Sequence, residues 1–228
     1  TKIMTALLTI ENLPDLNETI TVPEDIFEEL TAQDASVAGF NPYEQPTVRD
    51  LLYGVLLPSG ADACETLARA VGGSEEGFVA MMNQKAEELG LTNTHFENCT
   101  GLHNDNHYST CRDIAVLMSE CLKSDTFREI VTREVYTTEA TASHPEGITL
   151  YDTMLHRFTS YEMSTTLENG AVIEGGKTGF TDEAGQCLVS FAEYGGEEYI
   201  LVTAEAMTDS GSAVDSIADA STVYGRLQ

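Results

Sequence analysis

The apolar positions in the first half of the chain recur with the spacing of helices. The opening segment TKIMTALLTIEN, residues 1–12, carries apolar side chains so densely that they would surround most of a helix, which predicts a buried one. No capping residue precedes it, although a natural helix start rarely lacks one. We therefore expect a helix entered partway along its length, as in a chain that is cut at its N-terminus.

Capping residues mark the boundaries of further amphipathic segments. Thr47 precedes one apolar-periodic run, Ser109 or Thr110 precedes another, and Gly72-Gly73 ends a third. The break between two of these helices is the turn Pro58-Ser59-Gly60. The predicted helices cover residues 47–57, 61–73, 74–91, 109–122 and 124–131.

The remaining segments alternate with a period of two or lack a period. Residues 19–26 read as a short strand and turn, 92–109 as a polar loop, and 133–167 as a mixed segment with strand-like pieces such as EVYTTEAT. Residues 171–180, AVIEGGKTGF, read as a strand. Two apolar runs around Gly195-Gly196 predict a β-hairpin over residues 186–206.

A closing helix is predicted over residues 212–227. Helices thus dominate the first half, and antiparallel strands with a packing helix make the end, so the predicted fold class is α+β. We expect a single domain of two lobes, a helical lobe over about 12–165 and a sheet lobe over about 170–228.

Composition limits the partners of this chain more than its fold. Its 228 residues include 38 acidic and 11 basic side chains, a net charge of −27, and such a surface repels nucleic acid and anionic membranes. No apolar run approaches the roughly 20 residues that span a bilayer, and no signal peptide is visible. The five cysteines have no C-x-x-C spacing, and we interpret them as small buried hydrophobic residues.

Three polar positions are candidates for chemistry. Lys177-Thr178-Gly179 follows two glycines at the end of a strand, where a ligand backbone can approach closely and an ammonium can attract a carboxylate. Ser59 stands at a helix-to-helix break, where it would either cap the next helix or point into a cleft. Lys2 stands at the start of an apolar helix, where burial disfavours a charged amine and so favours a general base.

Together these residues occur in the order of the S-x-x-K, S-x-N and K-T-G motifs of penicillin-recognising serine enzymes. The segments TKIMTALL, LLPSGADA, FVAMMNQKAEELGLTNTHFENCTGLHNDNHYST and GGKTGFTDEAGQCLVS resemble those of serine-type D-alanyl-D-alanine carboxypeptidases, the low-molecular-mass penicillin-binding proteins. The resemblance covers the chain to about residue 205. It implies a β-lactamase/transpeptidase-like fold, an antiparallel sheet flanked by helices plus a mostly helical lobe, whose first strands would lie upstream of Thr1.

The resemblance also implies roles for these residues. The nucleophilic serine would lie two positions before Thr1, outside this sequence, with Lys2 as its base and Ser59 relaying a proton to the leaving amine. Lys177 and Thr178, in the motif completed by Gly179, would hold the substrate carboxylate, and the backbone N–H of Phe180 would contribute to an oxyanion hole. The site residues that the resemblance implies are Lys2, Ser59, Ala61, Lys177, Thr178, Gly179 and Phe180.

The sequence departs from the family pattern at two further places. Ala61 stands where the family's asparagine bonds the substrate, and one lost hydrogen bond in a dry site costs about 1–3 kcal/mol. No arginine occurs between Arg157 and Arg226, although many relatives use one after the last strand to bind the carboxylate. No segment resembles the loop whose glutamate speeds deacylation in class A β-lactamases, so we expect a slowly released acyl-enzyme.

The implied partners are peptidoglycan stem peptides that end in D-Ala-D-Ala and β-lactam antibiotics, with no cofactor and no metal. The family acts outside the cytoplasmic membrane, so the resemblance implies export by a signal peptide, and membrane contact only through segments absent from this sequence. Two alternatives stay open: a degenerate relative that binds wall peptide without catalysis, which Ala61 favours, and a β-lactamase or esterase of the same fold.

Two weaker interpretations concern Thr1 and a group of histidines. Thr1 would be an N-terminal nucleophile only if its amine were accessible, and the buried helix that follows argues against it. His103, Asp105 and His107 are close enough in sequence to ligate zinc, but they stand in a polar loop that resembles a structural stretch of the family.

Overall fold

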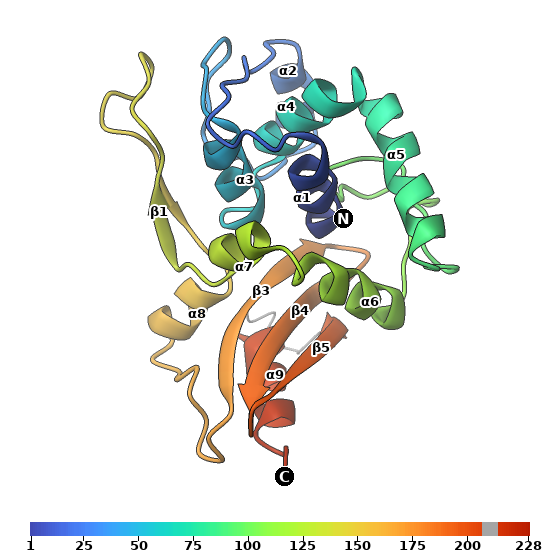
Figure 1. The fold of residues 1–228 in the computed structure, drawn as a ribbon, viewed down its shortest axis with the longest axis vertical. Helices are drawn as coiled ribbons and strands as arrows, with labels where there is room; N and C mark the ends of the chain where they lie inside the picture. Colours follow the sequence, from blue (N-terminus) through green and yellow to red (C-terminus); the bar gives the residue numbers. More distant parts are fainter. Residues whose placement is uncertain (207–213) are drawn as a thin grey trace.

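The computed structural model describes residues 1–206 and 214–228, and it consists of a helical part above a three-stranded sheet (Figure 1). The helices are α1 (Lys2–Asn12), α2 (Ile26–Ala32), α3 (Val48–Leu56), α4 (Ala61–Gly72), α5 (Glu75–Glu88), α6 (Cys111–Cys121), α7 (Asp125–Val131), α8 (Leu155–Ser160) and α9 (Asp215–Tyr224). The strands are β1 (Val135–Thr137), β2 (Thr149–Tyr151), β3 (Val172–Thr181), β4 (Gly185–Tyr194) and β5 (Glu197–Ala206). The α+β class is confirmed. Within these residues, none of the helices has the length and apolarity needed to cross a membrane.

Helix α1 is the buried centre of the helical part, as its apolar density predicted. It packs against α3, α4, α5, α6 and α7, and no side chain caps its start. Its buried threonines stay satisfied because Thr5 Oγ1 donates to the backbone oxygen of Cys99 at 2.7 Å and Thr9 Oγ1 donates to that of Thr5 at 2.8 Å. The N-terminus of α1 lies at the border between helices and sheet (Figure 1).

The predicted helix boundaries are confirmed where local capping sets them. Thr47 and Asp50 form a reciprocal capping box at the start of α3, and Ser74 and Thr110 cap α5 and α6 through their side-chain oxygens. Helix α4 ends at Gly73, whose φ of 77° is the left-handed conformation that glycine adopts without strain.

The sheet has the order β3-β4-β5, all antiparallel, and is covered on both faces. Alternate residues of β4 supply the two sides: Val189 and Phe191 join the helical core, while Leu188 and Ala192 join a smaller core with α9. The predicted hairpin is confirmed, and Gly195-Gly196 turns it with φ values of 64° and 86°. The predicted closing helix is observed as α9, and its expected first residues, 212–213, lie outside the described residues.

Several local expectations were wrong. Residues 19–26 form no regular strand: Val22 makes backbone hydrogen bonds with Tyr43 and Glu44, but Pro23 has no N–H to continue a ladder. The short helices α2 and α8 were not predicted, because no side chain caps their starts, whereas the equally short α7 is capped by Ser124 and was predicted.

The five cysteines are free thiols. Cys64, Cys99 and Cys121 are buried as predicted. The prediction is wrong for Cys111, which is exposed at the first residue of α6, and for Cys187, which is partly exposed.

Candidate active site

Lys177 lies inside β3, not at the strand end where the sequence placed it, and it is only 6% exposed. Its Nζ donates a hydrogen bond of 2.9 Å to the backbone oxygen of the next residue. At the two preceding positions, neighbouring backbone atoms lie so close that only glycine fits. A Cβ on Gly175 would lie 2.3 Å from the carbonyl oxygen of Val131, and one on Gly176 would lie 2.4 Å from that of Val189. The glycines therefore let α7 and β4 pack directly against this part of β3.

Two charged groups set the state of Lys177. Burial lowers the pKa of its amine, the nearby charge of Lys2 lowers it further, and the carboxyl of Asp152 raises it. Burial likewise raises the pKa of Asp152, which is 1% exposed, while the N–H of Leu155 and the charge of Lys177 lower it. Lys177 and Asp152 are therefore a buried base and acid whose protonation is linked.

Lys2 is the first residue of α1 and is partly buried. Its Nζ donates a hydrogen bond of 2.6 Å to the backbone oxygen of Thr100. The charges of Lys2 and Lys177 both act on the buried thiol of Cys64 in α4, and burial is the main cause that raises the pKa of that thiol to about 12. The structure thus brings together the start of α1, the first turns of α4 and the middle of β3.

Ser59 lies in the bend between α3 and α4 with a left-handed φ of 69°, a conformation that non-glycine residues rarely adopt. It does not cap α4: the N-cap is Gly60, and no side chain caps this helix. Among the described residues the Ser59 hydroxyl has no hydrogen-bond partner, so it is available to a ligand or a reacting group. A non-glycine residue at positive φ is a feature that clusters at functional sites.

Ala61, at the first position of α4, is 2% exposed, and its methyl group offers no hydrogen bond. The next residue fixes the bend: Asp62 Oδ1 accepts from Ala38 N at 2.7 Å, and Oδ2 accepts from Gly39 N and Phe40 N at 3.0 Å each. A buried carboxylate thus anchors a separate loop to the start of α4.

Thr178 is held by a residue that the sequence did not single out. Its Oγ1 lies 2.6 Å from Oγ1 of Thr153, and Thr153 N donates to the backbone oxygen of Leu57 at 3.2 Å. The turn after β2 therefore ties the K-T-G strand to the end of α3, beside the bend of Ser59. No local signal in the sequence links Thr153 to Thr178 or the buried Asp152 to Lys177, since the members of each pair lie far apart along the chain.

Gly179 and Phe180 lie on the outer part of β3, which is the edge strand of its sheet. The nearest atom to a Cβ on Gly179 would be Cys187 Cβ at 3.9 Å, and the Phe180 side chain is 63% exposed. An open edge strand presents N–H and C=O groups to which an extended peptide can pair.

The histidines of the polar loop have partners within the protein. His107 Nε2 lies 2.6 Å from Oγ1 of Thr1, and its Nδ1 accepts from Glu97 N at 3.1 Å, so both ring nitrogens have partners. Burial is the main cause that lowers the pKa of His107 to about 4. His103 lies 3.3 Å from exposed Asp105. This loop therefore braces the start of α1.

A cavity of about 750 Å³ lies beside the first residues of β3, between α7 and α8. Arg128, Glu134, Phe158, Met163 and Glu174 are among its lining residues. None of the candidate site residues lines it.

Comparison with solved structures defines the class of protein to which this arrangement belongs. The crystal structure of the Streptomyces K15 DD-transpeptidase superposes with a TM-score of 0.81 at 32% sequence identity, covering 98% of this chain and 85% of that one. The chain therefore has the fold of penicillin-binding proteins.

The sequence comparison is more specific. A family model described as D-alanyl-D-alanine carboxypeptidase matches residues 1–208, and the chain belongs to this family. It is 34% identical to the D-alanyl-D-alanine carboxypeptidase DacF of Bacillus subtilis over 91% of its length, and 36% identical to a D-alanyl-D-alanine carboxypeptidase of Streptomyces sp. strain K15 over 88%. The chain spans 50% of the first relative and 69% of the second.

Proposed function

We propose that the protein is a serine D-alanyl-D-alanine carboxypeptidase, which removes the terminal D-Ala of peptidoglycan pentapeptides through an acyl-enzyme. The observation that carries this proposal is the convergence of Lys2, Lys177 and the strained bend of Ser59 beside an open edge strand. Membership of the family, with two lysines of the expected motifs in one site, supports it.

Each residue has a role that its position suits. The nucleophile is the serine two positions before Thr1 in the full-length gene product, one helical turn from Lys2, so that the amine of Lys2 can accept the hydroxyl proton. Ser59, whose hydroxyl is otherwise unbonded among the described residues, passes a proton to the leaving amine. Lys177 and Thr178 bind the substrate carboxylate, and the Phe180 N–H stabilises the oxyanion with the N–H of the nucleophile.

The substrate follows from the same geometry. A peptide laid along the edge of β3 presents its C-terminal carboxylate to Lys177, and Gly179 leaves room for its backbone. Such peptides occur in peptidoglycan, so we place the protein outside the cytoplasmic membrane. β-Lactams imitate the D-Ala-D-Ala end and acylate the same serine, and no segment of this sequence resembles the loop whose glutamate speeds release in class A β-lactamases.

The test is the intact mass of the full-length gene product before and after incubation with benzylpenicillin. We expect a stable increase of one penicillin, located on the serine two residues before Thr1. Replacing Lys177 with Ala removes the carboxylate partner, and acylation should slow by roughly 100-fold or more. Lys123→Ala is the matched control, because Lys123 is exposed and its one ion pair among the described residues is with Glu120.

Two outcomes would contradict the proposal. Unchanged labelling of Lys177→Ala would remove this residue from the site. An unlabelled wild-type protein that also leaves penicillin intact would favour a wall-peptide-binding relative without catalysis, with Ala61 as the first suspect. Rapid turnover of a chromogenic cephalosporin would instead indicate a β-lactamase.

A further inference from the structure

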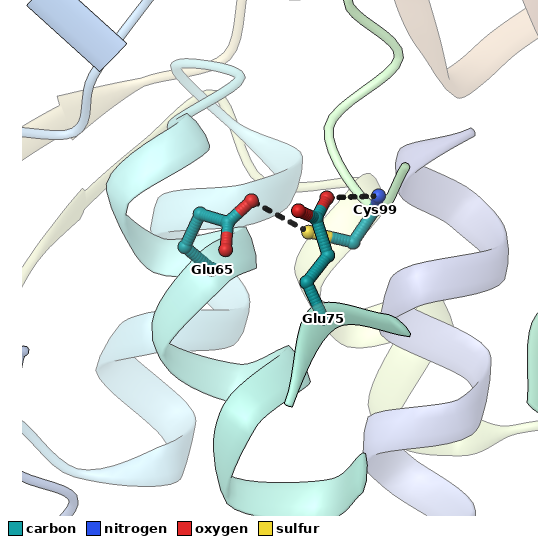
Figure 2. Close-up of side chains that lie close together, drawn as sticks. All are labelled: Glu65, Glu75 and Cys99. Atoms are coloured by element: carbon teal, nitrogen blue, oxygen red, sulfur yellow. Dashed lines mark hydrogen bonds between the residues drawn. The ribbon is translucent and has the colours of Figure 1, made fainter. Parts of the chain in front are cut away.

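Outside the candidate active site, three side chains with metal-binding atoms point toward one another (Figure 2). Glu65 comes from α4, Glu75 is the first residue of α5, and Cys99 lies in the loop before α6. Cys99 Sγ lies 3.4 Å from Glu65 Oε1, and Cys99 N donates to Glu75 Oε1 at 3.2 Å. One ligand atom from each residue lies within 4.8 Å of the other two. Such spacing is compatible with ligands around one ion.

Burial makes this cluster unusual. Cys99 is fully buried and Glu65 is 8% exposed, while Glu75 is partly exposed. Among the described residues, neither the Glu65 carboxylate nor the Cys99 thiol has a hydrogen-bond partner outside the cluster. Within residues 1–206 and 214–228, the cation paired with Glu65 is Arg69, whose Nε is 3.9 Å from Oε2 and whose Nη1 lies closer to Asp25, at 2.6 Å.

A buried carboxyl group next to a second, partly exposed one is costly with so little positive charge nearby, unless something neutralises the pair. Burial, and then the charge of Glu75, raise the pKa of Glu65 to about 7. A proton shared between the carboxyls is one way to neutralise the pair. A divalent cation is another, and it would use the inward-facing thiol of Cys99, which otherwise donates a hydrogen bond to Glu65.

We propose that Glu65, Glu75 and Cys99 bind one divalent ion of the zinc class. A thiolate with two carboxylates suits Zn²⁺ or Cd²⁺ and does not suit Mg²⁺ or Ca²⁺, which take oxygen ligands. On binding, the S–H bond of Cys99 breaks, a metal–sulfur bond forms, and the thiol proton leaves to solvent together with the proton of the carboxyl pair. No electron is transferred. Water supplies a fourth ligand on the side of the partly exposed Glu75.

The site is structural, because it touches no reacting atom. It would fix the loop of Cys99, whose backbone oxygen accepts from Thr5 of α1, and whose next residue supplies the oxygen that holds Lys2. Metal binding would thus stabilise the loop that positions α1. The sequence contains no ligand spacing for this site, since its residues come from three separate segments.

The experiment uses the full-length protein with the exposed Cys111 and the partly exposed Cys187 changed to Ser, so that these thiols cannot bind metal. Cd²⁺ is titrated while the thiolate-to-cadmium absorption is followed in the ultraviolet, and Zn²⁺ is then added to displace it. We expect one Cd²⁺ per chain, displacement by Zn²⁺, and a higher Tm with either ion. Zn²⁺ added to weakly buffered protein should release more than one proton per ion, whereas surface carboxylates release none.

Variants locate the site. Cys99→Ser should abolish the absorption, and Glu65→Gln should weaken Cd²⁺ binding by more than the about 10–100-fold that outer-shell partners cost. Cys121→Ser is the matched control, because it removes another buried thiol, one that bonds to the backbone oxygen of Ile3. Metal-free Tm values and circular dichroism show whether each variant folds.

Three results would overturn the proposal. They are Cd²⁺ absorption that survives Cys99→Ser, the absence of any such absorption in the parent protein, and Zn²⁺ binding without proton release. The first would place the metal elsewhere, and the other two would leave the cluster as a pair of carboxyls sharing a proton. The parent-protein titration needs no variant of the cluster, so it decides the question even if Cys99→Ser fails to fold.

Discussion

The charge of one residue, Lys177, depends on another that the motifs do not include. Asp152 is the buried acid that favours the ammonium form of Lys177 against burial and the repulsion of Lys2. Its Oδ1 also accepts from Met154 N at 2.9 Å and Leu155 N at 2.7 Å at the start of α8. The same carboxyl therefore has an electrostatic and a structural role.

The variant Asp152→Asn separates these roles, because an amide keeps the oxygen that caps α8 and loses the charge. Without the charge the pKa of Lys177 falls further, so its ammonium form persists only at lower pH. We expect the basic limb of the acylation profile to move to lower pH, with about a tenfold loss of rate on that limb for each unit. The measurement is the second-order rate of benzylpenicillin acylation of the full-length protein between about pH 5 and about pH 9.

Asp152→Ala serves as the comparison, since it removes both the cap and the charge. A lower rate at every pH, with the shape of the profile unchanged in Asp152→Asn, would mean that Asp152 acts only through the fold. An unchanged rate and profile would remove the residue from any account of the site.

At the scale of the elements, sequence reasoning succeeded where local chemistry sets a boundary. Thr47, Ser74 and Thr110 cap their helices, and Gly195-Gly196 turns the hairpin, because each acts on neighbours within a few residues. Elements of one or two turns, such as α2 and α8, were missed.

The candidate site shows the same limit. Resemblance brought Lys2, Ser59 and Lys177 together, but Thr153 and Asp152 became visible only through their tertiary contacts. The cluster of Glu65, Glu75 and Cys99 was invisible for the same reason, since no local pattern encodes a contact between separate segments.

Strand β3 allows a direct test of how tightly the site is packed. In Gly176→Ala the new methyl would meet the carbonyl oxygen of Val189 at 2.4 Å and Met154 Sδ at 2.8 Å. Because a backbone atom cannot turn aside, we expect a loss of about 1–3 kcal/mol in the free energy of unfolding. Urea unfolding measures it.

Gly179→Ala is the matched control on the same strand, since its Cβ would come no closer than 3.9 Å to Cys187 Cβ. Its stability should stay within about 0.5 kcal/mol of the parent. Equal losses in both variants would indicate that β3 resists any side chain at its glycines, for reasons other than these contacts.

The whole molecule carries a net charge of −27, and self-repulsion of this size opposes the compact state. A few close ion pairs, such as Arg128 with Glu198 at 2.7 Å and Lys85 with Glu11 at 2.9 Å, offset little of it. Raising NaCl from about 0.01 M to about 1 M shortens the screening length from about 30 Å to about 3 Å. We expect Tm to rise by several degrees, equivalent to about 1–2 kcal/mol.

The measurement is thermal unfolding by circular dichroism in NaCl at constant pH, with choline chloride as a second salt to separate screening from specific binding of sodium. A Tm that falls with salt would show that the ion pairs outweigh the repulsion. Equal rises in both salts would attribute the effect to screening alone.

The hydrogen bonds that Thr153 makes to Thr178 and Leu57 have a consequence for the order in which the parts of a newly made chain come together. Helix α1 precedes strand β3 along the chain, so the ribosome makes α1 first. Contacts between such distant segments close late, because a long loop must first lose its freedom. On the proposed function, a chain whose helices are already formed would therefore still be inert toward penicillin, and reactivity would appear only when the last strands dock. Covalent labelling by penicillin would thus count only the molecules in which the last strands have docked.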